Sequence, residues 1–338
     1  MVNNIGIFHD DLDGIGSRLM YDLAHADNDS ETWVSYCTSI DAIPKLIKYL
    51  EDEGILTTDS NITFGDISPS MEDANYLKYR VKSVEIYDHH PTAFPVQQVF
   101  PNAVIVPENA LGVKQCGTSL LYQHYAEIGN KYFTDEGNQK LLSKFVEKVR
   151  SYDNWEWKDT NDMEAKKLCM LYFMLGQERF MKRYLPRFLD STGTDDLFID
   201  TDLDFIEARL ENEQRTIDKL IDPDNAYCFW MGKYWCAMMV DTQGANISEL
   251  ASQFLTANPD YDIFILYSPH KGSGRLNFRT QRDNINLGID ICKPLGGGGH
   301  PKAAGAPTDV DLSIEMIDRV ISYMKEKLGI EEEKTKIF

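Results

Sequence analysis

The sequence predicts an α/β protein with a mostly parallel sheet in its N-terminal part, a helical segment, and a smaller α/β part at the C-terminal end. Three observations predict this class. Short apolar, β-branched runs alternate with helical periodicity over the first hundred residues, which is typical of βαβ units. The chain then becomes mostly helical, and strand-like runs return after residue 226. A length of 338 residues exceeds a usual single domain, so we expect two.

The first expected strands are short, and the one at residues 4–8 is expected to be buried. They comprise residues 4–8, 32–37, 62–64, 84–87 and 103–106. Helices are expected between them, from about Ile15, over 43–50 and over 71–81, because apolar residues recur there at helical spacing. Parallel sheets bind ligands beyond the carboxyl ends of their strands. We therefore expect His9, Asp66 and Asp88, which follow or end three of these strands, to lie at one edge.

The middle of the chain is expected to be helical. Helices are predicted from about Leu120 and over residues 138–151, 162–189 and 204–221, before strands at 226–231, 235–240, 262–267 and 275–280. The aromatic residues between 160 and 222 fall at helical spacing, which favours core packing over base stacking: Tyr172, Phe173, Phe180, Tyr184 and Phe188. That helical segment could add substrate contacts, a dimer surface or only bulk. The tail from Glu331 is charged and expected to be frayed.

Composition excludes several classes of protein. No apolar run approaches the roughly 20 residues that span a bilayer, and the N-terminus lacks the basic region of a signal peptide. The six cysteines show no CxxC spacing, which indicates reduced thiols and a cytoplasmic location. A net charge of −20 disfavours binding to long duplex nucleic acid. The substrate is therefore expected to be small, or its binding to depend on metals and a few local cations.

One region reverses the overall charge. Between His270 and Lys302 there are six Lys or Arg residues against two acids: Lys271, Arg275, Arg279, Arg282, Lys293 and Lys302, with Asp283 and Asp290. The run Gly296 to Gly299, followed by His300, lies in the same region. Such a run can bring backbone N–H groups close to an anion, although a flexible linker would also be rich in glycine. We predict an anion site here.

Short acidic segments follow three of the expected strands and one expected helix. They are His9-Asp10-Asp11-Leu12-Asp13-Gly14, Gly65-Asp66, Tyr87-Asp88-His89-His90-Pro91 and Tyr152-Asp153-Asn154. In an extended chain His9, Asp11 and Asp13 would point the same way, with Asp10 a solvated bystander. Taken alone, Asp66 also fits ordinary turn chemistry. Imidazoles mixed with carboxylates suit Mn²⁺ better than Ca²⁺. We predict that the four segments meet and hold a pair of metal ions.

These motifs, in this order and spacing, resemble the DHH phosphoesterase superfamily. The resemblance covers roughly residues 4–157 and 226–306. The superfamily includes RecJ-type single-strand exonucleases, nanoRNases that degrade short oligonucleotides, cyclic dinucleotide phosphodiesterases and family II pyrophosphatases. The compact His-x-Asp-x-Asp spacing is more similar to RecJ and one branch of nanoRNases. Pyrophosphatases and many cyclic dinucleotide enzymes have two more residues before the first Asp.

The resemblance implies a role for each candidate residue. By this resemblance one metal ion would be held by His9 and Asp11. The second would be held by Asp13, His89 and Asp153, and Asp66 would bridge the two ions. Asp88 and His90 would be the catalytic residues, Asp88 orienting its neighbours and His90 contacting substrate or transferring a proton. Substrate would be bound by the remaining residues: Arg275, Arg279, Gly297, Gly298, Gly299 and His300. Two divalent ions are implied, Mn²⁺ foremost and Mg²⁺ or Co²⁺ as alternatives.

We therefore expect a DHH-type metal-binding catalytic domain over residues 1–195, a helical connector over 196–223 and a DHH-associated C-terminal substrate-binding domain over 224–330. The expected activity is hydrolysis of short RNA or DNA oligonucleotides to mononucleotides, by attack of a metal-generated hydroxide on phosphorus in the cleft between the domains. The expected partner is a short single-stranded oligonucleotide or small nucleotide. No membrane is expected to be involved, and a homodimer is left open.

Two alternatives stand beside this prediction. One is a phosphodiesterase or phosphatase acting on a cyclic or signalling nucleotide, such as a cyclic oligonucleotide or phosphoadenosine phosphate. The other is a catalytically silent nucleotide-binding module. Against the silent module, every metal-ligating position implied by the resemblance carries a suitable residue.

Overall fold

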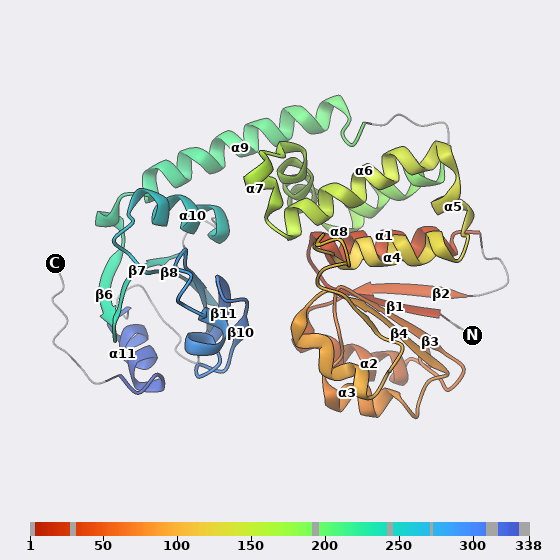
Figure 1. Ribbon diagram of the computed structural model, residues 1–338, viewed down its shortest axis with the longest axis horizontal. Coiled ribbons are helices and arrows are strands. Elements are labelled where there is room, and N and C mark those ends of the chain that lie inside the picture. Colours follow the sequence, from red (N-terminus) through yellow and green to blue (C-terminus); the bar gives the residue numbers. More distant parts are fainter. Residues whose placement is uncertain are drawn as a thin grey trace. The chain divides into compact units, whose positions relative to one another are not determined.

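In the computed structural model the chain forms two compact units, Met1–Ile206 and Glu207–Phe338. The structure describes residues 4–27, 32–190, 196–241, 246–270, 273–308 and 317–330. The tail from Glu331 and the predicted domain end at residue 195 lie outside this part of the chain. Each unit contains its own sheet (Figure 1). The boundary between the units falls within a long helix, α9 (Asp200–Leu220).

The first unit is built on a parallel sheet of five strands. Their order is β2-β1-β3-β4-β5, with β1 at Asn4–Phe8, β2 at Trp33–Cys37, β3 at Asn61–Gly65, β4 at Ser83–Asp88 and β5 at Val104–Ile105. Neighbours in this order pair in parallel, so all the strands end at the same edge. The β-branched and aromatic residues of these runs explain their strand structure, since they suit a pleated, buried surface.

Helices cover both faces of this sheet (Figure 1). On one face, α2 (Ile43–Asp52) and α3 (Met71–Leu77) pack against the alternate side chains of β1, β3 and β4 in one apolar core. The other face carries α1 (Leu12–His25) and α4 (Gly117–Glu127). Short 3₁₀ turns occupy Ile40–Ala42 and Pro91–Gln98. This arrangement confirms the predicted α/β class with a parallel sheet.

A helical region follows the sheet. It comprises α5 (Lys131–Thr134), α6 (Glu136–Asp153), α7 (Glu156–Thr160) and α8 (Met163–Leu189). Gly176 interrupts the helical backbone of α8 with φ of 69°. Four of the five aromatic residues expected in a core are buried: Tyr172, Phe180, Tyr184 and Phe188. Phe173 is the exception, because it is 68% exposed.

The second unit contains a mixed sheet of six strands in the order β10-β11-β9-β8-β7-β6. The strands are β6 (Tyr227–Met231), β7 (Tyr234–Val240), β8 (Ile263–His270), β9 (Ser273–Arg279), β10 (Gly298–Gly299) and β11 (Ala303–Thr308). The helix α10 (Ile247–Ala257) packs on one face with part of α9, and α11 (Ile317–Lys327) packs on the other. Short turns lie at Pro223–Asn225 and Leu287–Cys292.

Two details differ from the sequence-based expectation. Helix α1 begins at Leu12, not near Ile15, because the Asp11 side chain accepts a hydrogen bond from the Gly14 N–H and caps the helix. The elements α10, β10, β11 and α11 were not expected. Over the described ranges, every helix is too short or too polar to span a lipid bilayer.

Candidate metal centre

Three parallel strands deliver the central side chains. His9 follows β1, Asp66 follows β3, and His89 follows β4. Because β1 pairs with β3, and β3 with β4, these three residues leave the sheet at neighbouring points on its carboxyl edge. Asp153 joins them from the end of α6. Segments that are far apart in the sequence thus meet in one cluster.

The loop after β1 does not keep the alternating geometry expected for its three acidic positions. Asp11 caps α1, and Asp13 lies in the first helical turn. The expectation that the segment stays extended through Asp13 is therefore wrong. Asp13 still reaches the cluster, but from the helix, where it is only 1% exposed. Asp10, the expected bystander, has a side chain that is 47% exposed, but its Oδ1 lies 3.6 Å from His9 Nε2, so it is not isolated from the cluster.

The N-terminus of α4 holds the Asp13 carboxylate. The backbone N–H groups of Gly117 and Thr118 donate to its two oxygens at 2.6 and 2.8 Å. The Thr118 hydroxyl also donates to the Asp13 carbonyl at 2.8 Å. Sequence reasoning identified the start of this helix but assigned it no part in the site. The small residues Gly117-Thr118-Ser119 were the available signal, because they let a helix end approach a buried carboxylate.

Asp66 lies at the centre of the cluster in a strained backbone conformation. Its φ is 60°, in the left-handed region that non-glycine residues seldom adopt, and it is 2% exposed. Such strain persists where the surroundings hold a functional residue in place. A Cβ at Gly117 would stand 2.5 Å from the Asp66 Cβ and 2.7 Å from its Cα. The close approach therefore requires glycine at position 117.

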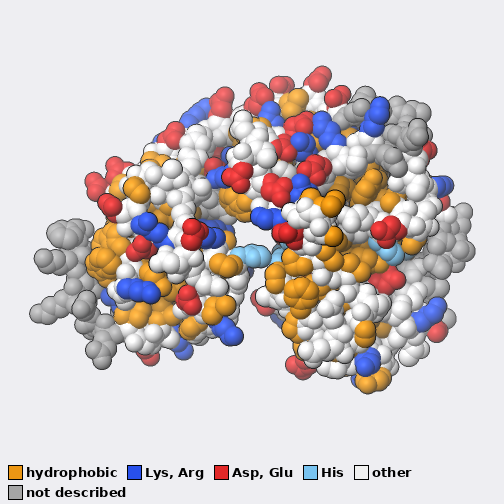
Figure 2. Space-filling model, viewed as in Figure 1, with side chains coloured by type: hydrophobic (Ala, Val, Ile, Leu, Met, Phe, Trp, Pro, Cys, Tyr) orange, Lys and Arg blue, Asp and Glu red, His pale blue; other side chains and the backbone are white. Residues whose placement is uncertain are grey.

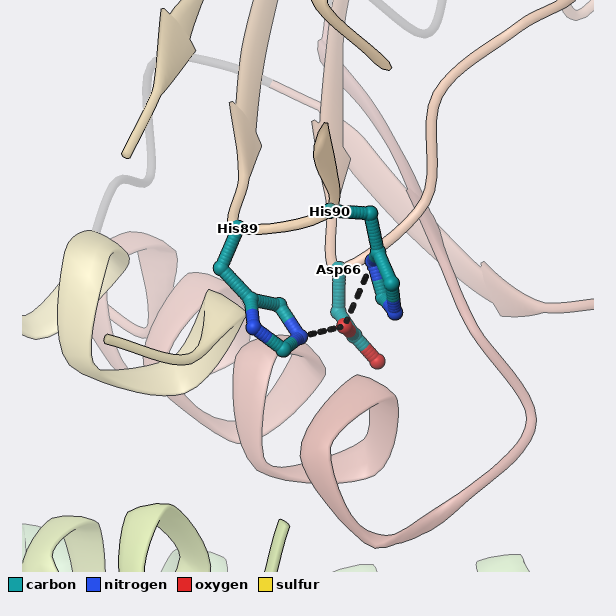
Figure 3. Close-up of side chains that lie close together, drawn as sticks. All are labelled: Asp66, His89 and His90. Atoms are coloured by element: carbon teal, nitrogen blue, oxygen red, sulfur yellow. Dashed lines mark ion pairs between the residues drawn. The ribbon is translucent and has the colours of Figure 1, made fainter. Parts of the chain in front are cut away.

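His89 lies close to three carboxylates. Its Nε2 lies 3.3 Å from Asp66 Oδ1, 3.4 Å from Asp153 Oδ2 and 3.9 Å from Asp13 Oδ2. Figure 3 shows the rings of His89 and His90 directed toward the Asp66 carboxylate. On the other side, His9 Nδ1 lies 2.7 Å from Asp11 Oδ2 and 3.6 Å from Asp66 Oδ2. Asp66 thus directs Oδ1 toward His89 and Oδ2 toward His9. It lies between the ligands around His9 and those around His89.

Asp88 fixes the orientation of His90. One oxygen of Asp88 accepts from the His90 backbone N–H at 2.9 Å and lies 2.8 Å from His90 Nδ1. Its other oxygen accepts from the Ser68 hydroxyl at 2.6 Å. His90 Nδ1 also lies 3.9 Å from Asp66 Oδ1. Ser68 was not anticipated, although a hydroxyl two residues after Asp66 in Phe-Gly-Asp-Ile-Ser-Pro is well placed to support the site.

The carboxylates are crowded enough to change their titration. Burial, together with the nearby charges of Asp13 and Asp11, raises the pKa of Asp66 well above its usual range. Burial and the charge of Asp13 raise the pKa of Asp153 to about 7. Burial opposes the charged form of His9, but the hydrogen bond to Asp11 and the negative charges of Asp11 and Asp66 outweigh it and raise the His9 pKa to about 11. Like charges held this close favour a bound cation.

The available donor atoms fit divalent metal ions. Three sets of side chains offer ligand atoms within 4.8 Å of one another: His9, Asp11 and Asp66; Asp13, His89 and Asp153; and Asp66, His89 and His90. Among the described residues, both Asp66 oxygens and His89 Nε2 are buried without a hydrogen-bond partner. Buried polar atoms rarely lack partners, and a cation would supply one here. Asp66 and His89 each occur in two sets, so they can serve neighbouring ions.

The predicted anion-binding residues lie in the second unit. Arg275 and Arg279 are on β9, and Arg279 donates to the Ser248 hydroxyl at 3.0 Å. Burial lowers the pKa of Arg279 to about 10, as does the charge of Arg275. The glycine run forms a turn and the short strand β10, which pairs with β11. A Cβ at Gly297 would stand 2.1 Å from the Gly305 carbonyl oxygen, so close backbone approach explains this glycine.

The loop itself is partly open to solvent. Gly298 and His300 are exposed, and a Cβ at Gly298 would meet no atom within 4 Å. The His300 N–H donates to the Ala303 carbonyl at 2.8 Å, and the Ala303 N–H donates to the His300 carbonyl at 3.3 Å. Lys271 of the basic region lies outside the described residues. The substrate-binding role of this loop and its arginines stays a prediction.

The fold and the clustered ligands resemble those of the DHH phosphoesterase superfamily, and the chain is similar in sequence to an oligoribonuclease and to a phosphodiesterase. Over 302 residues it is 29% identical to oligoribonuclease NrnB of Bacillus subtilis, covering 88% of this chain and 71% of that protein. It is 24% identical over 289 residues to a 3′,5′-cyclic-nucleotide phosphodiesterase of Helicobacter pylori, covering 73% and 77% of the two chains. No family model matches the chain.

Solved structures support the fold. The DHH domain of a member of the s1p family of ribosomal proteins superposes with a TM-score of 0.59 at 12% identity, covering 98% of this chain and 88% of that one. Exonuclease RecJ bound to manganese superposes with a TM-score of 0.55 at 14% identity, covering 98% and 91%. The two relatives and these structures together bear out the resemblance seen in the sequence.

Proposed function

We propose that this chain is a metal-dependent phosphodiesterase that hydrolyses short oligonucleotides to mononucleotides. The observation that carries the proposal is the meeting of His9, Asp66 and His89 at the edge of the parallel sheet, with three further carboxylates around them. Two hydrolytic relatives, an oligoribonuclease and a cyclic-nucleotide phosphodiesterase, support the reaction class.

The proposed ligand assignment places two divalent ions on either side of Asp66. His9 and Asp11 would hold one ion, and Asp13, His89 and Asp153 the other. Ions bound there would activate water for attack on phosphorus and offset the charge that develops on the phosphate. Mn²⁺ is the preferred ion because the ligands combine imidazoles and carboxylates, and a RecJ structure of the same fold contains manganese.

The protein's own groups would position the phosphate. Asp88 and Ser68 hold His90 at the rim of the cluster, where it can bond to a phosphate oxygen or transfer a proton. Burial of His90 opposes its charged form, but the hydrogen bond to Asp88 raises its pKa. A protonated imidazole would then be available to donate to the phosphate. Arg279 and the glycine run are the proposed contacts of the second unit.

Charge favours short substrates over long ones. Among the described residues on the face shown in Figure 2, Lys and Arg side chains lie in small groups interspersed with Asp and Glu. Long nucleic acids are usually bound through many phosphates by a continuous basic surface, which a net charge of −20 opposes. A dinucleotide needs only a few cationic contacts. The six cysteines, all within the described ranges, form no disulfides, which suits a reducing compartment, so we place the activity in the cytoplasm.

A labelled oligonucleotide ladder tests the proposal. Purified protein with Mn²⁺ is expected to convert di- to pentanucleotides into mononucleotides, and 5′ and 3′ labels will show the end at which cleavage starts. Asp66→Asn should lower kcat by at least about a thousandfold, because it removes the central carboxylate of the metal centre. Asp41→Asn, at an exposed position away from the cluster, is the control and should retain most activity. A folded wild-type protein that leaves all these substrates intact would refute the proposal.

A cyclic nucleotide is the second candidate substrate, since one relative is a 3′,5′-cyclic-nucleotide phosphodiesterase. Turnover of linear dinucleotides, cyclic dinucleotides and 3′,5′-cyclic mononucleotides should be compared side by side. A kcat/KM that is higher for either cyclic class would replace the oligonucleotide assignment.

A further inference from the structure

Three aromatic residues flank Asp153, the candidate metal ligand at the end of α6. Tyr152 and Trp157 stack with ring centroids 5.9 Å apart and planes 12° apart, and Trp155 lies 6.1 Å from Trp157. Trp157 is 6% exposed and anchors the group, whereas Trp155 is 39% exposed. We call these three residues the aromatic patch. The Trp155 ring is thus partly exposed to solvent, whereas the Trp157 ring is packed in the interior.

Two lysines bring positive charge to the aromatic patch. Lys158 Nζ lies 5.1 Å from the ring centroid of Trp155 and 5.5 Å from that of Trp157. Lys166 lies on α8, and its Nζ is 5.5 Å from the centroid of the Trp157 ring. A ring flanked by ammonium groups is the combination that binds single-stranded nucleotides, because the base stacks and the cation meets phosphate. In a chain of net charge −20, this local combination calls for a specific explanation.

The chain itself ties this surface to the metal centre. Trp155 is two residues from Asp153, so the two Cα atoms lie within about 7 Å of each other. Asp153 in turn lies 3.4 Å from His89. The backbone of Trp155 is also unusual, with φ of 63°, in the left-handed region that large side chains rarely adopt. The turn after α6 therefore holds an exposed indole two residues along the chain from a candidate metal ligand.

We propose that Trp155 is a substrate-positioning residue on which a nucleobase of the oligonucleotide stacks, with Lys158 beside it to meet a phosphate. This inference rests on the proposed function, and it adds a base-recognition contact in the same unit as the metal centre. Stacking on an indole accepts every base, so it selects nucleotides over other phosphodiesters without selecting a sequence. We assign the contact to a base next to the scissile phosphate.

Steady-state kinetics with two substrates test the contact. The substrates are an RNA dinucleotide and the matched dinucleotide with one base replaced by an abasic ribose. Trp155→Ala should raise KM for the intact dinucleotide about 5- to 100-fold, as expected for loss of one stacked base, with kcat nearly unchanged. It should leave KM for the abasic substrate unchanged. Trp155→Phe keeps an aromatic face and should restore most of the affinity.

Two controls separate stacking from damage to the site. Trp230→Ala removes an indole that is 55% exposed in the second unit, and it should leave both kinetic constants unchanged. Titration calorimetry with Mn²⁺ should give the same affinity for wild type and Trp155→Ala. Equal kcat/KM for wild type and Trp155→Ala on the intact dinucleotide would overturn the inference. So would an equal loss on the abasic substrate, or a loss of Mn²⁺ affinity, since either result means a structural role.

A binding measurement keeps the inference testable if the proposed function fails. A dinucleotide with a non-hydrolysable methylphosphonate linkage should quench tryptophan fluorescence in the wild type. Trp155→Phe should bind it by calorimetry while losing most of the quenching. If the wild type cleaves nothing but shows this pattern, the proposed function falls and the stacking contact stands. If the wild type cleaves dinucleotides and quenching persists in Trp155→Phe, the stacking contact falls alone.

Discussion

At the residue scale, Asp22 is an informative buried carboxylate outside the metal centre. It lies on α1, 4% exposed, and its Oδ2 is 3.7 Å from Arg18 Nε. Its other oxygen has no hydrogen-bond partner among the described residues. Burial raises the pKa of Asp22 to about 6, although a hydrogen bond from Ser35 and the charge of Arg18 act in the opposite direction. The ionised form is therefore the costly one.

The pH dependence of stability follows from this pKa. Between the unfolded value of about 3.9 and the folded value of about 6, the native state binds more protons than the unfolded state. The free energy of unfolding must then fall as pH rises through that window. Asp22→Asn cannot ionise, so relative to wild type it should gain about 1–2 kcal/mol between pH 5 and pH 8. Urea unfolding at the two pH values measures the difference.

The matched control for this prediction is Asp41→Asn, at an exposed position. Its stability relative to wild type should be the same at both pH values. A constant difference between Asp22→Asn and wild type across the range would mean that Arg18 keeps Asp22 ionised in the folded protein without cost.

At the element scale, α1 and α4 pack closely beneath the metal centre. A Cβ at Gly16 would stand 2.3 Å from the Thr118 hydroxyl oxygen, and that hydroxyl donates to the Asp13 carbonyl. Gly16→Ala should therefore destabilise the protein by about 1–3 kcal/mol through overpacking, despite the better helix propensity of alanine. The nearest atoms belong to the Thr118 side chain, so the clash should be relieved when that side chain is shortened.

A double-mutant cycle measures this coupling. Thr118→Ala alone should cost about 0.5–1.5 kcal/mol for the lost hydrogen bond. The double variant Gly16→Ala/Thr118→Ala should be more stable than the sum of the single effects by about 1 kcal/mol or more. Thr160→Ala, whose hydroxyl donates within its own helix α7, should combine additively with Gly16→Ala. Additivity at Thr118 as well would show that the helices separate to accommodate the methyl group.

Sequence patterns predicted the strands of the first unit because local runs determine them. The runs over residues 4–8, 62–64 and 84–87 were predicted as strands, and the ends of the observed strands bring His9, Asp66 and His89 together. The path of Asp13 was not predictable in this way. Its carboxylate is held by N–H groups 104 and 105 residues further along the chain, a tertiary contact that no local spacing reveals. The same holds for the left-handed backbone of Asp66, which depends on the close approach of Gly117.

The second unit was less predictable for a different reason. Helix α10 carries a recognisable signal, with Asn246 as its cap and Leu250 and Phe254 one turn apart. The strands β10 and β11 carry almost none, because Gly298–Gly299 and Ala303–Thr308 are built from small residues that lack β propensity. Their structure comes from pairing with β9 and from backbone contacts at Gly297 and Gly299. The glycine-rich run therefore indicated that its backbone lies close to another group. It did not indicate that this group is the backbone of the same chain.

At the scale of the whole molecule, the two units have separate hydrophobic cores. The first unit buries β1, β3 and β4 against α2 and α3. The second buries its mixed sheet between α10 and α11. The clustered His and Asp ligands all belong to the first unit. Cation binding should therefore stabilise the first unit directly. It should stabilise the second unit only if the two units unfold cooperatively.

Calorimetric unfolding with and without Mn²⁺ tests this separation. We expect two transitions, of which only the one belonging to the first unit rises with Mn²⁺. A ligand at 100 times its dissociation constant stabilises the state that binds it by about 2.7 kcal/mol, which should shift that transition by several degrees. Asp66→Asn should abolish the shift, while Trp230→Ala, in the second unit, should retain it and can mark which transition is which. A single transition that moves as a whole would instead mean that the two cores unfold cooperatively, and a pair of transitions that both ignore Mn²⁺ would mean that the clustered carboxylates do not hold the ion.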